Sequence, residues 1–353
     1  MCINKMLFSV NRLHLYSLLR MPPYSLLIIV TILNGFIHAT MTQTIQTGRF
    51  DESIAPKESG CPNAEDIMPC ECYTYPSQVE LRLRCDNVTS EDELKHVFEA
   101  YFPNKNFKSF SMNVNEYIKT LEAGIFNDVT FEDIIISYSR LEVIATDAFN
   151  SSYNTIKTMN FLFSDLLHLP FVNFHDLKKL QSFQIVRNSL SFIHAETFYG
   201  LDALEMIVIR QTTANITGTF QNIPNLINLE LRDNNLTSVP THFCKTGSTN
   251  IKKVDLAFNR ISEVADDAFD AVAGMSIDIH FNLLTELPES TWRPLLEAGV
   301  TVNAFGNPLL CGCDIAWMFD SAHLVNHMSY GTECDDGNGT LIHNVDPSIF
   351  DNC

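Results

Sequence analysis

The cysteines are the residues of this 353-residue chain whose number and spacing could do chemistry. Eight of the ten form two groups of four that flank a long stretch rich in apolar residues: Cys61, Cys70, Cys72 and Cys85, then Cys311, Cys313, Cys334 and Cys353. Four thiols can pair as two disulfides or bind one zinc ion together. Disulfides form in oxidising compartments, and the N-terminus described below predicts secretion, so we predict disulfides and no metal. Spacing alone allows three pairings within each group.

The other two cysteines are Cys2 and Cys244. Cys2 lies in a segment that we expect to be removed from the mature chain. Two interpretations of Cys244 stay open: it packs as a small buried apolar side chain, or it forms a disulfide with another chain.

The sequence has no motif typical of catalysis. GxSxG, HExxH and glycine-rich phosphate loops are absent. The segment 335–339, Asp-Asp-Gly-Asn-Gly, has part of a calcium loop but lacks the full ligand spacing, so we interpret it as a surface turn. We predict no cofactor and no enzyme activity, and we keep an enzyme with an unrecognised site as an alternative.

The N-terminus predicts the compartment. Residues 24–37 form an apolar run that follows Lys5, Arg12 and Arg20 and precedes Ala39. This composition is typical of a secretory signal peptide, and the run is short for a membrane-spanning helix. We predict a signal peptide over 1–39, with a retained anchor as the alternative, and a flexible polar leader over 40–60. No later stretch approaches roughly 18 consecutive apolar residues, so we expect no membrane span.

Charge and glycosylation motifs agree with an extracellular location. The chain has 42 acidic and 23 basic residues, and removal of 1–39 takes away three basic ones, which leaves a net charge of 20 − 42 = −22. Such a surface repels nucleic acid, so we expect no nucleic-acid partner. Five N-x-S/T motifs are candidate glycosylation sites. They begin at Asn87, Asn150, Asn215, Asn235 and Asn338.

A repeat predicts the elements between the cysteine groups. A polar residue recurs at steps of 24, 25, 24, 24, 22, 25, 23 and 25 residues: Asn115, Ser139, Ser164, Asn188, Thr212, Asn234, Asn259, Asn282 and Asn307. A period of roughly 20 to 29 residues indicates a solenoid of stacked turns. An Asn amide can donate to and accept from the backbone of neighbouring turns, so we expect a ladder of these side chains. Ser and Thr fill only part of that role, so the turns that contain them should be less regular.

Apolar residues surround each slot of the repeat at fixed positions, eight, five and three residues before it and two after it. Two copies are Leu226, Leu229, Leu231 and Leu236, and Phe107, Phe110, Met112 and Tyr117. The middle pair alternates with exposed residues, as in a short strand buried on one face. A second column of aromatic residues predicts a packed core behind the strands. It consists of Phe126, Phe149, Phe174, Phe198, Phe220, Phe243, Phe269 and Trp292.

Two helices are expected at the ends of the stack. Ser90-Glu-Asp-Glu93 is a capping-box pattern, and four residues at helical spacing follow it: Leu94, Val97, Phe98 and Tyr101. We predict a helix over 90–102 and a counterpart over 314–327. The buried side of the counterpart would carry Ile315, Met318, Phe319, Ala322 and Val325.

The repeated pattern LxxLxLxxNxL resembles that of leucine-rich repeat proteins, in nine copies between residues 107 and 310. This resemblance implies an α/β solenoid, a leucine-rich repeat horseshoe with a concave parallel β-sheet. The cysteine groups resemble the flanking modules of Slit, Toll ectodomains and the small leucine-rich proteoglycans. That implies two disulfide-braced caps, over 61–106 and 311–353. By resemblance the bonds are Cys61–Cys72, Cys70–Cys85, Cys311–Cys334 and Cys313–Cys353.

The segment 61–72, Cys-Pro-Asn-Ala-Glu-Asp-Ile-Met-Pro-Cys-Glu-Cys, looks like the start of secreted arthropod repeat proteins. That group includes a non-catalytic luciferase subunit. The resemblance implies a secreted accessory chain that associates with another protein, and it implies no monooxygenase activity here.

We predict the binding surface on the concave face, where apolar and aromatic residues are rimmed by charges. The predicted contact residues are Ile135, Tyr138, Leu162, Phe163, Arg187, Glu230, Arg232, Asp255, Phe258, His280 and Phe281. The predicted function is a secreted module for an extracellular protein partner, as a non-catalytic accessory subunit or interaction scaffold. The alternative is a soluble receptor-like protein of innate immunity or development that binds a glycan or microbial ligand on the same face.

Overall fold

The structure is a computed structural model that describes residues 60–75, 78–169, 171–212 and 214–353. The signal peptide predicted over 1–39 and nearly all of the leader predicted over 40–60 lie outside the described residues. None of the helices in the described part is long and apolar enough to cross a bilayer.

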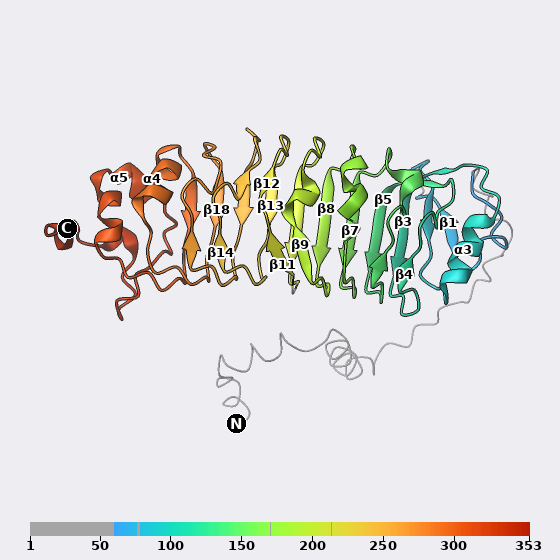
Figure 1. The fold of residues 1–353 in the computed structure, drawn as a ribbon, viewed down its shortest axis with the longest axis horizontal. Coiled ribbons are helices and arrows are strands. Elements are labelled where there is room, and N and C mark those ends of the chain that lie inside the picture. Colours follow the sequence, from blue (N-terminus) through green and yellow to red (C-terminus); the bar gives the residue numbers. More distant parts are fainter. Residues whose placement is uncertain (1–59, 76–77, 170, 213) are drawn as a thin grey trace, which may run out of the picture. The chain divides into compact units, whose positions relative to one another are not determined.

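One eleven-stranded sheet runs through the described chain (Figure 1). Its first two strands, β1 (Glu71–Tyr73) and β2 (Arg82–Arg84), pair antiparallel, and every later strand joins the sheet in parallel and in sequence order. Nine strands belong to the repeat, as its period predicts. They are β3 (Asn106–Asn113), β5 (Thr130–Ser137), β7 (Thr158–Leu162), β8 (Ser182–Val186), β10 (Met206–Arg210), β13 (Asn228–Glu230), β16 (Lys253–Asp255), β18 (Ser276–Asp278) and β19 (Thr301–Asn303).

The predicted ladder of Asn side chains joins the turns. Asn282 Nδ2 donates to the carbonyl of Leu256 in the preceding turn and to that of Ile279 in its own, both at 3.0 Å. Its Oδ1 accepts from the N–H of Ile261 at 2.9 Å. Asn259 and Asn307 repeat this pattern. These buried bonds satisfy backbone groups where each strand bends inward.

The turns without Asn differ from this pattern, as expected. The hydroxyls of Ser139 and Ser164 lie 3.1 Å apart and bond to each other, and the hydroxyl of Ser164 also donates to the carbonyl of Leu162 in its own turn at 3.3 Å. One predicted core residue is wrong: Tyr117 is 61% exposed, and Ile118 is buried in its place. Asn115 Oδ1 accepts from the N–H groups of both Tyr117 and Ile118, at 3.0 and 2.8 Å, and the side chain that enters the core is that of Ile118.

Short segments return the chain from each strand to the next. They include paired two- or three-residue strands: β4 (Thr120–Leu121) with β6 (Val143–Ile144), β9 (Phe192–His194) with β11 (Asn215–Thr217), β12 (Phe220–Gln221) with β15 (Cys244–Lys245), and β14 (Ser238–Val239) with β17 (Glu263–Val264). The helical returns are η1 (Asn150–Ser152), η2 (Phe171–Asp176), η3 (Ala195–Phe198) and α4 (Glu289–Glu297).

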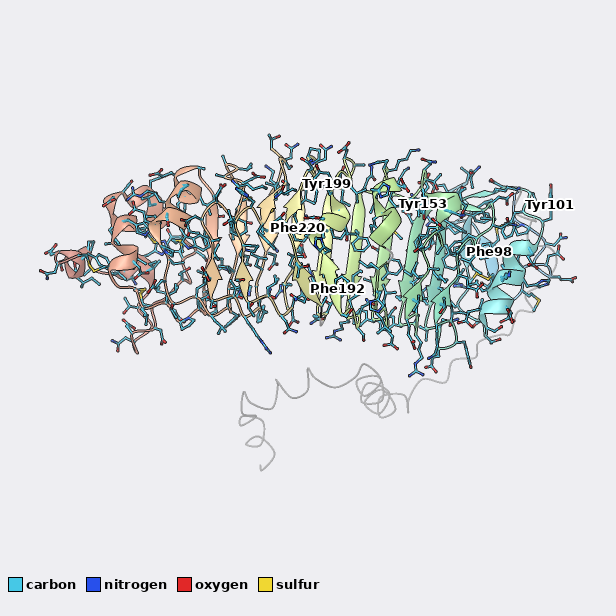
Figure 2. The ribbon with its side chains drawn as sticks, viewed as in Figure 1. Phe98, Tyr101, Tyr153, Phe192, Tyr199 and Phe220 are labelled. Carbon is cyan, nitrogen blue, oxygen red and sulfur yellow. A yellow bond between two sulfur atoms is a disulfide. The ribbon has the colours of Figure 1, made fainter. Side chains whose placement is uncertain are left out.

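The predicted aromatic column fills the space between the sheet and these returns. All eight of its members are buried, and neighbouring rings pack on one another, for example Phe198, Phe220 and Phe243 at centroid distances of 6.1 and 5.5 Å. In Figure 2 Phe220 lies inside the stack, while Phe192 and Tyr199 lie at its margins. The column is therefore part of the hydrophobic core.

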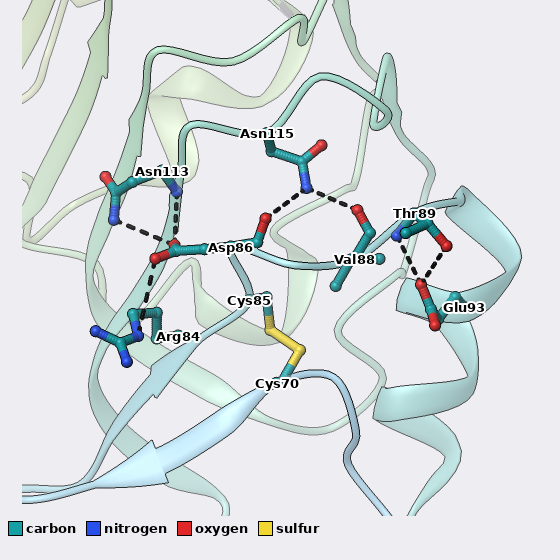
Figure 3. Close-up of a disulfide and its surroundings, with 9 residues drawn as sticks. All are labelled: Cys70, Arg84, Cys85, Asp86, Val88, Thr89, Glu93, Asn113 and Asn115. Carbon is teal, nitrogen blue, oxygen red and sulfur yellow. Dashed lines mark hydrogen bonds and ion pairs between the residues drawn. A yellow bond between two sulfur atoms is a disulfide. The ribbon is translucent and has the colours of Figure 1, made fainter.

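The N-terminal cap contains the predicted helix, α3 (Glu91–Glu99), and two disulfides. The N–H of Glu93 donates to Ser90 Oγ at 3.2 Å, and the Glu93 carboxylate accepts from the N–H of Thr89 rather than that of Ser90. Figure 3 shows how the cap meets the first turn: the amide of Asn115 donates to the carbonyls of Asp86 and Val88 beside the Cys70–Cys85 bond. The first member of the ladder thus joins the cap to the repeat.

The C-terminal cap differs from the prediction of one helix over 314–327. It has two helical segments, η4 (Cys313–Asp320) and α5 (Ala322–Asn326), followed by η5 (Ile342–Asn344) and η6 (Pro347–Phe350). The break falls at Ser321, whose backbone is extended and whose hydroxyl accepts from the N–H of His323. Ala322 is therefore exposed rather than buried.

All four disulfides have the pairing that the resemblance implies: Cys61–Cys72, Cys70–Cys85, Cys311–Cys334 and Cys313–Cys353, with Cα atoms 4.3 to 5.8 Å apart. Among the described cysteines, the one with a free thiol is Cys244 in β15, which is 1% exposed. Burial raises the pKa of this thiol, and the charge of Asp270 adds to the effect. This burial favours the role of Cys244 as a small apolar core residue, and a disulfide to another chain would require β15 to open.

Candidate functional site

The outward residues of the repeat strands form one continuous face, which we call the sheet face. In each turn they lie four and two positions before the ladder residue, because the residues between them point into the core. In β5, for example, Ile134 and Ile136 are fully buried while Ile135 is partly exposed. Parallel register aligns equivalent residues of neighbouring strands, so Ile135 lies beside Asn160 and Ser137 beside Leu162.

The N-terminal half of the sheet face combines partly exposed apolar residues with polar neighbours such as Asn160 and Ser137. The partly exposed Ile135 and Leu162 come from neighbouring strands, and Val186 continues the series in β8. Val208 of β10 is 6% exposed and contributes little accessible surface. Clustered apolar side chains on an exposed face are typical of a partner-binding surface.

A second set of residues lies directly before each ladder position, at the carboxyl ends of the strands, and we call it the left-handed edge. It consists of Val114, Tyr138, Phe163, Arg187, Gln211, Asp233, Phe258, Phe281 and Gly306. All nine have φ between 51° and 68°. The cause is the turn-to-turn backbone bonding: the N–H of Tyr138 donates to the carbonyl of Leu162, for example, and that of Phe258 donates to the carbonyl of His280.

Four of the nine are aromatic, in a conformation that bulky side chains avoid. Tyr138 and Phe163 stack face to face, with ring centroids 4.7 Å apart and planes 7° apart. Phe258 and Phe281 form a second pair at 4.9 Å, and Phe281 packs on Phe305 beyond it. The left-handed edge thus carries two aromatic pairs.

An arginine covers each aromatic pair on the side toward the middle of the edge. The guanidinium of Arg187 lies 5.2 Å from the centroid of Phe163, and that of Arg232 lies 5.0 Å from the centroid of Phe258. Arg187 Nε also donates to Gln211 Oε1 at 2.7 Å. Gln211 Nε2 in turn donates to Asp233 Oδ2 at 2.7 Å. The side chains between the two pairs are therefore held in place.

Two of the predicted acidic contacts are not available at the surface. The Asp255 side chain is 1% exposed, because it pairs with Lys253 at 2.9 Å and accepts from the N–H of Ala257. This corrects its assignment as a contact residue. The Glu230 side chain is 14% exposed and pairs with Arg210. His280 is partly exposed and pairs with Asp278, and its ring packs against Phe258 at 4.8 Å.

Ion pairs occupy the start of the sheet face. Glu132 accepts from Lys108 and Lys157, both at 3.0 Å. Burial opposes ionisation of both Lys108 and Glu132, but the hydrogen bond between them and the neighbouring charges raise the pKa of Lys108 and lower that of Glu132. These residues line an open hollow of about 300 Å³ beside Val79 and Phe107. No three His, Cys, Asp or Glu residues gather in a metal-binding arrangement within the described part of the chain.

The five predicted glycosylation sites are all exposed, and none lies in a strand of the main sheet. Asn150 begins η1 and Asn215 begins β11, both in return segments, while Asn87 and Asn338 lie in the caps. Asn235 follows the ladder residue Asn234 and is exposed.

The sequence placed eleven contact residues on one face, and the structure divides them between two surfaces. Ile135, Leu162, Glu230, Arg232, Asp255 and His280 belong to the sheet face, whereas Tyr138, Phe163, Arg187, Phe258 and Phe281 belong to the left-handed edge. The left-handed edge could have been recognised in the sequence, because its residues all lie directly before a ladder residue. They form a separate column of the repeat that runs from Val114 to Gly306.

Comparison with known proteins identifies similar chains. Residues 82–166 and 164–276 match the model of the BspA type leucine rich repeat region, in six copies. The chain is 30% identical over 357 residues to the Oplophorus-luciferin 2-monooxygenase non-catalytic subunit of Oplophorus gracilirostris, across 93% of this chain and 97% of that protein.

Among solved structures, it is similar to a chain of the octameric complex of Latrophilin 3 (Lec, Olf), Unc5D (Ig, Ig2, TSP1) and FLRT2 (LRR). The TM-score is 0.55 and the identity 15%, over 79% of this chain and 92% of that one. This likeness shows the fold alone.

Proposed function

Because the chain belongs to the leucine-rich repeat family, we propose that it is a secreted, non-catalytic accessory chain whose sheet face binds an extracellular protein partner. The observation that carries the proposal is that the partly exposed Ile135 and Leu162 lie on neighbouring strands, and that the stacked rings of Tyr138 and Phe163 directly follow those two strands. A preformed sheet loses little conformational freedom when a partner docks on it.

Three further observations support this proposal. The similar chain from Oplophorus gracilirostris is described as a non-catalytic subunit, which by its name works with another chain. Four disulfides brace the caps, and disulfides persist in oxidising compartments. The candidate glycosylation sites lie away from the strands of the sheet face, so secretion and glycosylation are compatible with a partner there.

The experiment is purification of the tagged full chain with its associated proteins from the secretions of its source organism. We expect a stoichiometric second chain that is retained by the wild type and lost with Ile135→Arg. The matched control is Tyr199→Arg, which places the same charge on an exposed tyrosine beside η3, in a return segment. Recovery of a lone glycosylated monomer, or equal retention by Ile135→Arg and the wild type, would contradict the proposal.

A further inference from the structure

The left-handed edge has a backbone conformation that its aromatic residues do not favour. Asp233 and Gly306 occupy the same slot as Tyr138, Phe163, Phe258 and Phe281, with φ of 58° and 68°. Asp, Asn and Gly adopt this conformation with less steric conflict than aromatic residues. Since the repeat tolerates the small residues here, the four rings are not required by the fold. Strained residues of this kind are typical of functional positions.

The charges of the edge also differ from those of the chain. The whole chain carries a net charge of −19, and most of its described basic side chains lie beside carboxylates. Among the described residues, Arg187 and Arg232 form no ion pair, and neither do Lys252 and Arg260, but Arg187 and Arg232 each lie against an aromatic ring. Arg187 uses Nε for Gln211, which leaves its two terminal amino groups without a hydrogen bond within the described part. A guanidinium in that state presents a pair of donors suited to a carboxylate.

We propose that the left-handed edge, together with Arg232 of the adjoining sheet face, binds an acidic segment of the protein partner, with carboxylates on Arg187 and Arg232 and apolar side chains against the two aromatic pairs. This proposal rests on the proposed function and names the chemistry of the partner. The two arginines follow β8 and β13, which are separated by β10. Two strand spacings set their backbones roughly 10 Å apart, the distance spanned by about three residues of an extended segment.

The arrangement favours a protein segment over a sulfated polysaccharide. Sugar rings would stack on exposed aromatic faces, but Tyr138 and Phe163 cover each other's faces and Arg187 lies over the far side of Phe163. The net charge of −19 also repels a long polyanion, whereas two arginines can pair with the few carboxylates of a short acidic segment. Ring edges with neighbouring guanidinium groups suit mixed apolar and acidic side chains.

The test uses the glycosylated full chain, panned against a random twelve-residue peptide library at low ionic strength. We expect enriched peptides with two acidic residues about three positions apart and apolar residues beside them. Arg187→Glu and Arg232→Glu should each lower the affinity of these peptides about tenfold. Lys252→Glu is the matched control, because Lys252 is exposed at the amino-terminal end of β16 and should leave the affinity unchanged.

A second set of variants separates binding from folding. Phe163→Asn and Phe258→Asn replace a ring by a residue that tolerates positive φ. We expect both to raise the midpoint of thermal unfolding and to weaken peptide binding, a combination that misfolding cannot produce. Peptides without acidic bias, no enrichment, or affinity unchanged by Arg187→Glu and Arg232→Glu would overturn the proposal. So would heparin binding that these variants abolish, because that result would assign the arginines to a polysaccharide.

The same variants distinguish a failure of this proposal from a failure of the proposed function. If the natural partner is lost with Ile135→Arg but retained by Arg187→Glu and Arg232→Glu, the sheet face binds it and the left-handed edge does not. If no partner is found for the wild type, the proposed function fails first.

Discussion

The side-chain amide of Asn282 donates to the carbonyl oxygen of Leu256 at 3.0 Å, although 26 residues separate them in the chain. The same side chain accepts from the N–H of Ile261 and donates to the carbonyl of Ile279. One buried amide thus satisfies three backbone groups in two turns. The repeat of this arrangement at Asn259 and Asn307 explains why the spacing of a single residue type predicts the fold.

Asn282→Ala should lower the stability of the full chain. Ile261 loses its acceptor and two buried carbonyls lose a donor, and each unsatisfied buried group costs about 1–3 kcal/mol. Allowing for relaxation, we expect the free energy of unfolding to fall by about 3 kcal/mol, measured by denaturant titration with disulfides intact. Asn250→Ala is the control, because Asn250 is exposed and should change stability by less than about 0.5 kcal/mol. Equal midpoints for the two variants would contradict a structural role for the ladder.

The inward-facing part of the fold could be predicted from the sequence because burial repeats with the strand period. Leu229, Leu231 and Leu236 lie where the pattern places them, and so do the aromatic residues behind the sheet. The predicted position of the core residue was wrong in the first turn, where Ile118 is buried and Tyr117 is exposed. The prediction of one continuous C-terminal helix was wrong at Ser321, because the spacing of apolar residues does not reveal a break made by one extended residue.

The candidate site was less predictable because its geometry depends on contacts between turns. Asp255 looks like an exposed charge in the sequence, but a lysine two residues away and a backbone N–H bury it. The positive φ of Phe163 arises from a hydrogen bond to the carbonyl of Val186 in the following turn. That hydrogen bond cannot be inferred from the types of the residues, because it forms between the backbones of two turns. The covering of Phe163 by Arg187 likewise depends on stacking between neighbouring turns.

Gly306→Ala should displace the ring of Phe281. A Cβ at Gly306 would lie 2.6 Å from Phe281 Cδ1, well inside van der Waals contact, and the ring is also held by Phe305. Gly200→Ala is the matched control: its φ is +71° against +68°, and a Cβ there meets nothing within 4 Å. Both variants should lose about 1 kcal/mol to backbone strain, and Gly306→Ala should lose about 1–3 kcal/mol more. Thermal unfolding measures the difference, and identical midpoints would show that the ring moves freely.

Asp336 predicts a pH dependence in the C-terminal cap. A hydrogen bond from the Thr340 hydroxyl, and others from the N–H groups of Asn338 and Thr340, lower the pKa of its carboxyl to about 2 from an ordinary 3.8. A carboxyl with a lowered pKa in the folded state stabilises it above the unfolded value, and this stabilisation is lost as the pH falls from about 4 to about 2. Asp336→Asn should therefore lower the unfolding midpoint at pH 7 and have no effect at pH 2. Asp335→Asn is the control at the same loop, and a constant difference at both pH values would exclude the linkage.

The thiol of Cys244 should be hidden from reagents in the folded chain. It is 1% exposed, and burial raises its pKa, so little thiolate forms and little of the sulfur meets solvent. In the mature protein we expect no reaction with Ellman's reagent under native conditions, and one thiol per chain in about 6 M guanidinium without reductant. Cys244→Ala should abolish that thiol and lower stability by about 1 kcal/mol, since a small side chain leaves a small cavity. A denatured count of zero together with a reductant-sensitive dimer would instead show that Cys244 is held in a disulfide between chains, which requires β15 to open.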